Sequence, residues 1–284
     1  MSNIKGGFML SIAEHLEPDI QTLPNYAGIY VFYNHENYPL YIGKSKSIKK
    51  RVLSHVADAK LSARKAKLMV QAVRIGYEHT AGEYTALFRE AELIKQYAPL
   101  HNKKLRKLRN FLTLKINQGT KKLEYVNCIN GEDLSQHYGL FKSKRLAVAK
   151  LTTLCEKQKI CKKLCGLSST APCFNYQLKQ CHGSCQTADY SAQHPQLLKN
   201  ALGSLKLQQW PYAGLVALEE KCAHTGLIQY ILLYKWCFLG IVNSLNNLTT
   251  IVQAYENRRF DKDFYYLSLQ ALQKIMPQNL ELAN

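Results

Sequence analysis

The 284-residue chain has few acidic residues and no long uncharged apolar stretch. Its 20 Asp and Glu stand against 38 Lys and Arg, which leaves a formal net charge of +18. The most apolar stretch, 226–242, contains Gln229 and Lys235, so it does not have the pattern of a transmembrane helix. The N-terminus also lacks a secretory signal, because Glu14 and Glu17 follow closely on its short apolar patch. We therefore expect a cytoplasmic protein with no membrane contact.

The excess of positive charge favours a polyanionic partner, with nucleic acid as the first candidate and an anionic membrane surface as the weaker one. Hydrophobic residues make up 46% of the chain and charged residues 20%, which is typical of a folded protein and excludes a disordered one. The length suffices for two or three structural units. The mixture of strand and helix patterns predicts an α/β (α+β) fold.

A β-hairpin is predicted near the N-terminus. Apolar residues alternate over 29–33, a polar turn follows at 34–37, and a second apolar run covers 40–42. The hairpin places Tyr30 and Tyr41 on neighbouring strands.

A helix is predicted over 48–58, directly after the hairpin. Arg51 and His55 are four residues apart and therefore share one helical face. Together with Lys44 and the two tyrosines, they are predicted to converge at one end of a small sheet.

These residues resemble the GIY-YIG nuclease family. The two diagnostic triplets stand at 28–30 (Gly-Ile-Tyr) and 41–43 (Tyr-Ile-Gly), and Lys44 and Arg51 follow them. The segment 90–102 is similar to the helix and turn that carry a metal-binding glutamate and a downstream asparagine in the UvrC-type excinuclease branch of that family.

The resemblance implies metal-dependent hydrolysis of a phosphodiester bond. Glu90 would hold one Mg²⁺ or Mn²⁺, Tyr41 would take a proton from the attacking water, and Arg51 would clamp the phosphate with its planar fork. A phenol is a poor base at neutral pH, so Lys44 and the metal would favour its ionised form.

The remaining residues of the predicted site are assigned supporting roles. Tyr30 would orient the water or a partner hydroxyl. His55 stands where UvrC proteins have a tyrosine, and proton transfer, a phosphate contact and no role at all stay open for it. The candidate DNA-binding residues follow the hairpin and the second motif: Lys46, Lys49, Lys50, Asn102, Lys103 and Lys104. Asn102 is also expected to fix the loop beside the site.

Six of the nine cysteines lie within 155–185. Their spacing does not follow the paired Cys-x-x-Cys of zinc ribbons, so tetrahedral zinc, an iron-sulfur cluster and free buried cysteines remain open. The segment 171–185 resembles the cysteine segment of UvrC-type proteins, which implies a 4Fe-4S cluster with zinc as the alternative. The implied ligands are Cys161, Cys173, Cys181 and Cys185, and Cys165 competes for the first position.

Three domains are expected. Residues 1–104 form a nuclease domain with a three-stranded sheet and helices, and 105–209 form a connecting hairpin and a cysteine-rich, mainly helical unit. Residues 210–284 form a small α+β domain with no recognisable chemistry, including a strand near 249–254 and a last helix over 261–275.

The chain has no room for the second nuclease domain of full-length UvrC proteins. It therefore resembles short relatives that make one incision, on the 3′ side of a lesion, in nucleotide excision repair. The expected substrate is double-stranded damaged DNA, with UvrB loaded on it, and a monomer is the expected state. The alternatives are a GIY-YIG endonuclease for branched or foreign DNA, independent of excision repair, and a basic DNA-binding module without activity.

Overall fold

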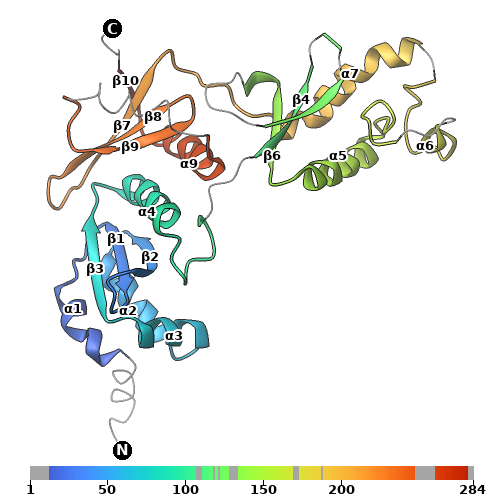
Figure 1. Cartoon of the computed structure of the whole chain (residues 1–284). Helices are drawn as coiled ribbons and strands as arrows, with labels where there is room; N and C mark the ends of the chain where they lie inside the picture. The colour runs from blue at the N-terminus through green and yellow to red at the C-terminus, as the bar shows by residue number, and fades with distance from the viewer. Residues whose placement is uncertain are drawn as a thin grey trace, which may run out of the picture. The chain divides into compact units, whose positions relative to one another are not determined.

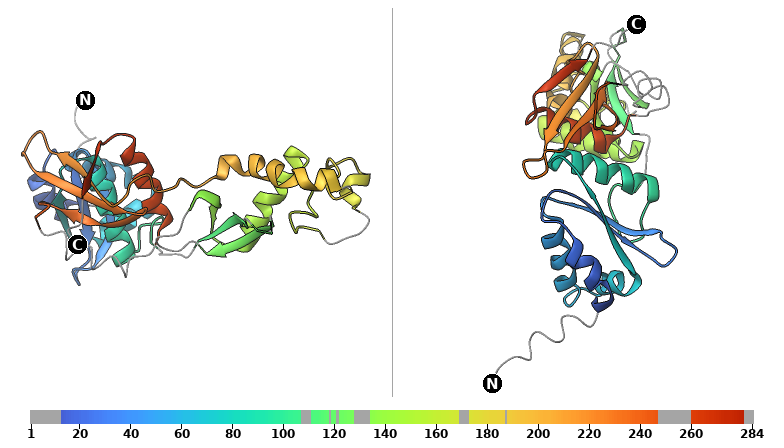
Figure 2. Two further views of the ribbon diagram at one scale, coloured as in Figure 1. Left: turned by 90° about the horizontal axis from the view of Figure 1, so that it is seen from above. Right: turned by 90° about the vertical axis from the view of Figure 1, so that its left-hand side faces the viewer.

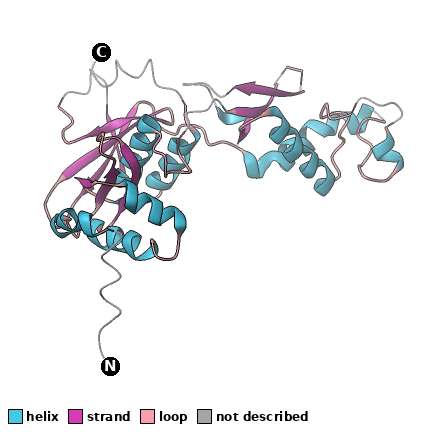
Figure 3. Cartoon of the chain, turned by 60° about the horizontal axis from the view of Figure 1, so that its bottom comes forward, coloured by secondary structure: helices cyan, strands magenta, loops and turns pink. Residues whose placement is uncertain are grey.

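The computed structural model describes residues 13–106, 111–117, 119–120, 122–127, 134–168, 173–186, 188–246 and 260–280. The chain divides into two compact units (Figure 1). The first comprises Met1–Leu108, Tyr212–Arg258 and Asp263–Asn284, and the second comprises Arg109–Pro211 and Arg259–Lys262. Helices and strands are mixed in both units (Figure 3), which confirms the predicted α/β class.

The first unit begins with an antiparallel three-stranded sheet in the order β2-β1-β3. Its strands are β1 (Gly28–Tyr33), β2 (Pro39–Ser45) and β3 (Arg74–His79). Gly28 is required at the start of β1, because a Cβ there would overlap the backbone carbonyl of Glu78 on β3. In this order β2 is an edge strand, so no strand of the sheet covers its outer side and a functional site can form there.

Helices cover both faces of this sheet. On one face, Tyr30, Phe32 and Leu40 pack with residues of η1 (Glu14–Leu16), α1 (Glu17–Thr22), α2 (Ile48–Asp58) and α3 (Ala63–Gln71). On the other face, Ile29 and Val31 pack against α4 (Glu83–Tyr97). This division follows from the alternation of side chains along a strand. The helix at 48–58 has the bounds that the sequence predicted. The apolar period of Leu87, Ala91, Ile94 and Tyr97 likewise predicts a helix from about 83 to 97, and α4 has these bounds.

A second sheet completes the first unit. It has four antiparallel strands in the order β10-β7-β8-β9. These are β7 (Leu215–Lys221), β8 (Ile228–Tyr234), β9 (Cys237–Val242) and β10 (Pro277–Leu280), with the helix α9 (Lys262–Leu272). Helix α4 lies between the two sheets of this unit (Figures 1 and 2). The predicted strand at 249–254 lies outside the described residues.

The second unit contains a three-stranded sheet in the order β5-β4-β6. Its elements are β4 (Leu112–Ile116), β5 (Leu123–Asn127), η2 (Leu134–Gln136), β6 (His137–Phe141), α5 (Lys144–Gln158), α6 (Phe174–Gln177), α7 (Ala188–Leu202) and η3 (Gly203–Leu205). Residues of β4, β6, α5 and α7 share one core. The cysteine segment lies in the chain between α5 and α7.

Among the described residues, no helix has the length and apolar character needed to span a bilayer.

Candidate active site

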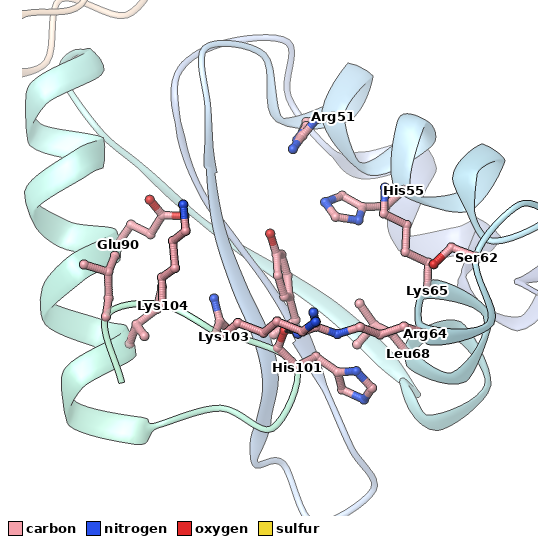
Figure 4. Close-up of a pocket in the computed structure, with 14 residues that line it drawn as sticks. Arg51, His55, Ser62, Arg64, Lys65, Leu68, Glu90, His101, Lys103 and Lys104 are labelled. Atoms are coloured by element: carbon pink, nitrogen blue, oxygen red, sulfur yellow. Dashed lines mark hydrogen bonds between the residues drawn. The ribbon is translucent and has the colours of Figure 1, made fainter. Parts of the chain in front are cut away.

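A cavity of about 760 Å³ lies against the edge strand β2, with α2 and α3 on one side and α4 on the other (Figure 4). Glu90 projects from α4, and Arg51 and His55 come from α2 on the opposite wall. The lining includes Tyr41 from β2 and five basic residues, which are Arg51, Arg64, Lys65, Lys103 and Lys104. Glu90 is the single acidic side chain among the described lining residues, so the cavity suits an anionic ligand.

Three aromatic rings pack against one another beside α2. The hydroxyl of Tyr30 lies 2.9 Å from Nε2 of His55, and both residues are buried. The ring of Tyr41 lies 5.2 Å from that of His55 and 6.0 Å from that of Tyr30, measured between centroids. Gly43 makes this packing possible, because a Cβ at that position would overlap the ring and hydroxyl of Tyr30. Gly43 of the second triplet therefore leaves the space that the ring of Tyr30, in the first triplet, occupies.

Burial sets the protonation of the Tyr30–His55 pair. It lowers the pKa of His55 to about 4, and the charges of Arg51 and Lys65 act in the same direction. Burial and the neighbouring Tyr41 raise the pKa of Tyr30. Tyr30 and His55 are therefore both uncharged, and the tautomer of the imidazole decides which of them donates the hydrogen bond between them. Nδ1 of His55 is buried and has no hydrogen-bond partner in the described part of the chain.

Glu90 is held at the cavity by the backbone of β2. Its Oε1 accepts a hydrogen bond from the backbone N–H of Lys44 at 3.2 Å. Burial raises the pKa of Glu90, and Lys44 and Arg51 oppose this shift. The second carboxylate oxygen accepts none of the hydrogen bonds found among the described residues. A hard carboxylate with a free oxygen, facing a cavity that admits water and phosphate, fits Mg²⁺ or Mn²⁺.

The side chain of Lys44 does not take the predicted place beside Tyr41. The two residues are three apart on β2, so their side chains lie on opposite faces of the sheet. The Lys44 ammonium instead bonds Glu83, in the first turn of α4, at 3.4 Å. The contribution of Lys44 to the site is its backbone N–H, which donates a hydrogen bond to the carboxylate of Glu90.

The six candidate DNA-binding residues differ in their surroundings. Lys103 and Lys104 are exposed and line the cavity, as Figure 4 shows. Lys46 pairs with Glu83 at 2.7 Å and remains 73% exposed, while Lys49 donates to the backbone carbonyl of Gln21 at 2.9 Å. Lys50 is exposed on α2.

Asn102 is buried and bonds the backbone of β2. Its Oδ1 accepts from the N–H of Ile42 at 3.0 Å, and its Nδ2 donates to the carbonyl of the same residue at 2.8 Å. The neighbouring His101 donates its backbone N–H to Leu40 at 2.9 Å. This geometry fits the expected loop-fixing role of Asn102 better than a contact with DNA.

Two lining residues, Arg64 and Lys65, were absent from the predicted site. Arg64 donates to the backbone carbonyl of His101, and Lys65 pairs with Asp58. Both stand in a basic stretch at the start of α3, which on sequence is typical of a solvent-exposed helix. The positive charge of the two residues was visible in the sequence, but their position at the cavity depends on how α3 packs in the fold.

The cysteines of the second unit form two groups. The Sγ atoms of Cys161, Cys173 and Cys185 lie within 4.8 Å of one another, and Cys181 belongs to the same buried cluster. Burial and the adjacent thiols raise the pKa of Cys185 to about 11. Cys165 lies elsewhere, with its Sγ 3.7 Å from that of Cys155 and 3.7 Å from Nε2 of His194. Three thiols at ligand spacing, with Cys181 packed beside them, fit a metal ion or an iron-sulfur cluster, which takes thiolate ligands.

Comparison with known proteins covers nearly the whole chain. Residues 26–103 match the UvrC-like GIY-YIG domain, residues 111–204 match the middle domain of the UvrC/Cho excinucleases, and residues 215–284 match the C-terminal domain of excinuclease Cho. Excinuclease Cho of Escherichia coli strain K12 is 36% identical over 263 residues, which are 91% of this chain and 86% of that protein. Excinuclease Cho of Salmonella typhi is 35% identical over 276 residues, 95% of this chain and 90% of that protein.

Among solved structures, the N-terminal GIY-YIG endonuclease domain of UvrC from Thermotoga maritima, bound to its catalytic magnesium, is 29% identical. It covers 30% of this chain and 93% of the domain, with a TM-score of 0.28. The identity to the two Cho proteins extends over most of their length, and all three domain matches agree with it. The chain therefore belongs to the Cho family of UvrC-like GIY-YIG excinucleases, and it is a metal-dependent DNA endonuclease.

Proposed function

We propose that this endonuclease acts in nucleotide excision repair and makes one incision, on the 3′ side of a lesion in duplex DNA. The observation that carries the proposal is the placement of Glu90 across one basic cavity from Tyr41 and Arg51. The names of the Cho relatives support the repair role, and the match to one GIY-YIG nuclease domain fits a single cut.

The residues of the cavity have complementary roles in this proposal. Arg51 clamps the scissile phosphate with its planar fork, and Lys103 and Lys104 add positive charge along the backbone of the strand. Tyr41 lines the cavity and accepts a proton from the attacking water. A Mg²⁺ or Mn²⁺ ion, when bound at Glu90, supplies positive charge next to the developing pentacoordinate phosphate. Tyr30 and His55 hold the ring of Tyr41 in place.

In this proposal Cys161, Cys173, Cys181 and Cys185 bind a 4Fe-4S cluster, with a zinc ion as the alternative. Cys161 is the first ligand, since Cys165 lies with Cys155 and His194. The cluster has a structural purpose, because thiolate ligation couples directly to folding and the four cysteines come from three separate stretches of the second unit.

The partner and the assembly follow from the same role. We propose that UvrB loaded at the lesion presents the DNA, that the protein acts as a monomer, and that it works on chromosomal DNA in the cytoplasm. We also propose the domain limits 1–104, 105–209 and 210–284, with the first and last domains packed as one unit.

The proposed cation site is tested by nicking of a lesion-bearing duplex. The metal-free protein should be inactive, and addition of Mg²⁺ should restore cutting. Glu90→Gln should abolish the restored activity and leave DNA binding within about twofold. The matched control is Glu92→Gln, on the same helix, where the side chain pairs with Arg89 outside the cavity. Full cleavage by Glu90→Gln, or cleavage in the presence of EDTA, would overturn the cation site.

A further inference from the structure

We propose that the C-terminal sheet is part of the catalytic apparatus, because Glu220 of β7 caps the helix that carries Glu90. Glu220 is a positioning residue: it touches neither the cavity nor its lining, and it acts through α4. The inference rests on the proposed function in one respect, namely that Glu90 is the cation ligand.

Helix α4 has an unusual N-terminus. The first N–H groups of a helix need acceptors outside the helix, and a side chain at the N-cap position usually supplies one. Here the N-cap residue is Gly82, which has no side chain. The acceptor comes from a strand 135 residues later in the chain, where Glu220 Oε1 accepts from the N–H of Tyr84 at 3.1 Å and Oε2 from that of Thr85 at 2.6 Å.

Gly82 and Glu220 are matched to each other. A Cβ built at Gly82 would overlap the carboxylate of Glu220, so any side chain at position 82 requires this carboxylate to move away from its place at the cap. A carboxylate in this position also interacts favourably with the partial positive charge at a helix N-terminus. The capping acceptor of α4 is therefore supplied by Glu220 of the C-terminal sheet and not by a side chain of the nuclease domain at position 82.

Four further contacts attach α4 and the residue Ala81 before it to other residues of the C-terminal sheet and of α9. Gln229 Oε1 accepts from the backbone N–H of Ala81 at 2.8 Å, just before the helix. In the middle, Phe88 packs on Phe238 and Phe264, with centroids 5.1 and 6.0 Å away. In the last turn, the ammonium of Lys95 is 2.7 Å from the Asp263 carboxylate, and the Lys95 side chain is only 5% exposed. The helix is thus fixed from before its first turn to its last.

The opposite side of α4 carries the groups that face β2. Glu83 bonds Lys44 and Lys46, and Glu90 accepts from the N–H of Lys44. A shift of α4 along its axis would therefore move the Glu90 carboxylate relative to Tyr41 and Arg51. Displacements of about 1 Å at a reacting group cost large factors in rate.

The test compares Glu220→Ala with Glu219→Ala, the neighbouring β7 residue, whose carboxylate accepts from Gln278. Each variant is assayed on a lesion-bearing duplex for kcat, KM and the Mg²⁺ concentration that gives half-maximal nicking. Glu220→Ala should raise that concentration about tenfold and lower kcat, with KM for DNA within about twofold, as for residues that orient metal ligands. Glu219→Ala should behave as the unmodified protein. Glu220→Gln, which retains one acceptor oxygen, should have an intermediate effect.

A second-site variant separates positioning from general stability. In the Glu220→Ala background, Gly82→Asp places a capping carboxylate within the helix itself, in the space that Glu220 vacates. It should restore the Mg²⁺ dependence to within about threefold, whereas Gly82→Asp alone should impair activity because the two carboxylates collide. Two results would overturn the proposal: equal Mg²⁺ dependence of Glu220→Ala and Glu219→Ala, or a double variant that regains Tm without regaining Mg²⁺ affinity. Absence of any Mg²⁺-dependent nicking by the unmodified protein would instead refute the proposed function.

Discussion

The Tyr30 hydroxyl lies 2.9 Å from Nε2 of His55, and this buried pair lies under the ring of Tyr41. Since burial lowers the pKa of His55 to about 4, its imidazole is neutral at the pH of any repair reaction. We infer that His55 holds Tyr30, and through it the face of Tyr41, and that it does not bind phosphate as a cation.

The first prediction concerns stability and pH. The unfolded chain takes up a proton at His55 near the ordinary pKa of about 6.5, whereas the folded protein does so only near 4. The stability contributed by neutral His55 is therefore present above 6.5 and lost as the pH falls towards 4. Tm measured at pH 7 and pH 5 should fall less in His55→Phe than in the unmodified protein. His35→Gln, in the exposed hairpin turn, is the control. The same fall in His55→Phe and the unmodified protein would refute the assignment.

The second prediction separates binding from chemistry. Tyr41→Phe removes the proton acceptor and should lower the nicking rate by about 100-fold or more. Arg51→Lys keeps the charge but loses the planar fork, so it should cut slowly while binding the duplex within about threefold. Single-turnover rates and fluorescence anisotropy measure the two effects. Lys60→Ala, an exposed loss of charge beyond the end of α2, is the control. Normal cutting by Tyr41→Phe would exclude Tyr41 as the base.

The third prediction follows from the burial of Glu90, which raises its pKa. The folded metal-free protein then holds this proton more tightly than the unfolded chain does, so ionised Glu90 destabilises the metal-free fold at neutral pH. Glu90→Gln should therefore have a higher Tm than the unmodified protein in EDTA. Added Mg²⁺ should raise Tm of the unmodified protein and of Glu92→Gln, because the cation binds only the folded state. An equal rise in Glu90→Gln would show that the cation binds elsewhere.

The fourth prediction distinguishes the two cysteine groups. Anaerobic purification should give a brown protein with broad visible absorption. Cys161→Ser should lose iron and colour, because Cys161 lies with Cys173 and Cys185. Cys165→Ser should keep both, because its thiol faces Cys155 and His194. Metal analysis of the two variants checks this, and a colourless zinc protein would replace the iron-sulfur assignment by the zinc alternative.

Local patterns predicted the fold of the nuclease domain well. The alternation at 29–33 and the helical period at 83–97 gave β1 and α4 nearly to the residue, because both elements bury one face in a local core. The order of the strands, which puts β2 at the edge, was not readable from the hairpin. That order brings Glu90 and Tyr41 to one cavity from opposite faces of the sheet.

Contacts between distant segments were beyond the sequence patterns. The apolar period of α4 predicts a buried side made of Leu87, Ala91, Ile94 and Tyr97. Ala91 and Ile94 are buried as predicted, and Phe88 is buried as well because the C-terminal sheet covers a second side of the helix. Glu220 could not be selected either, because a surface carboxylate on a strand has no sequence feature that links it to Gly82. Strand β10 was missed because Pro277–Leu280 has no alternating pattern.

We propose that one active site makes one incision, on the 3′ side of a lesion. The decisive measurement uses a duplex with a single bulky lesion and both strands end-labelled, incubated with Mg²⁺ in the presence or absence of UvrB. We expect one product, from the damaged strand cut 3′ to the lesion, that requires UvrB and disappears in Glu90→Gln. Incisions on both sides of the lesion, or equal cutting of undamaged duplex without UvrB, would contradict it.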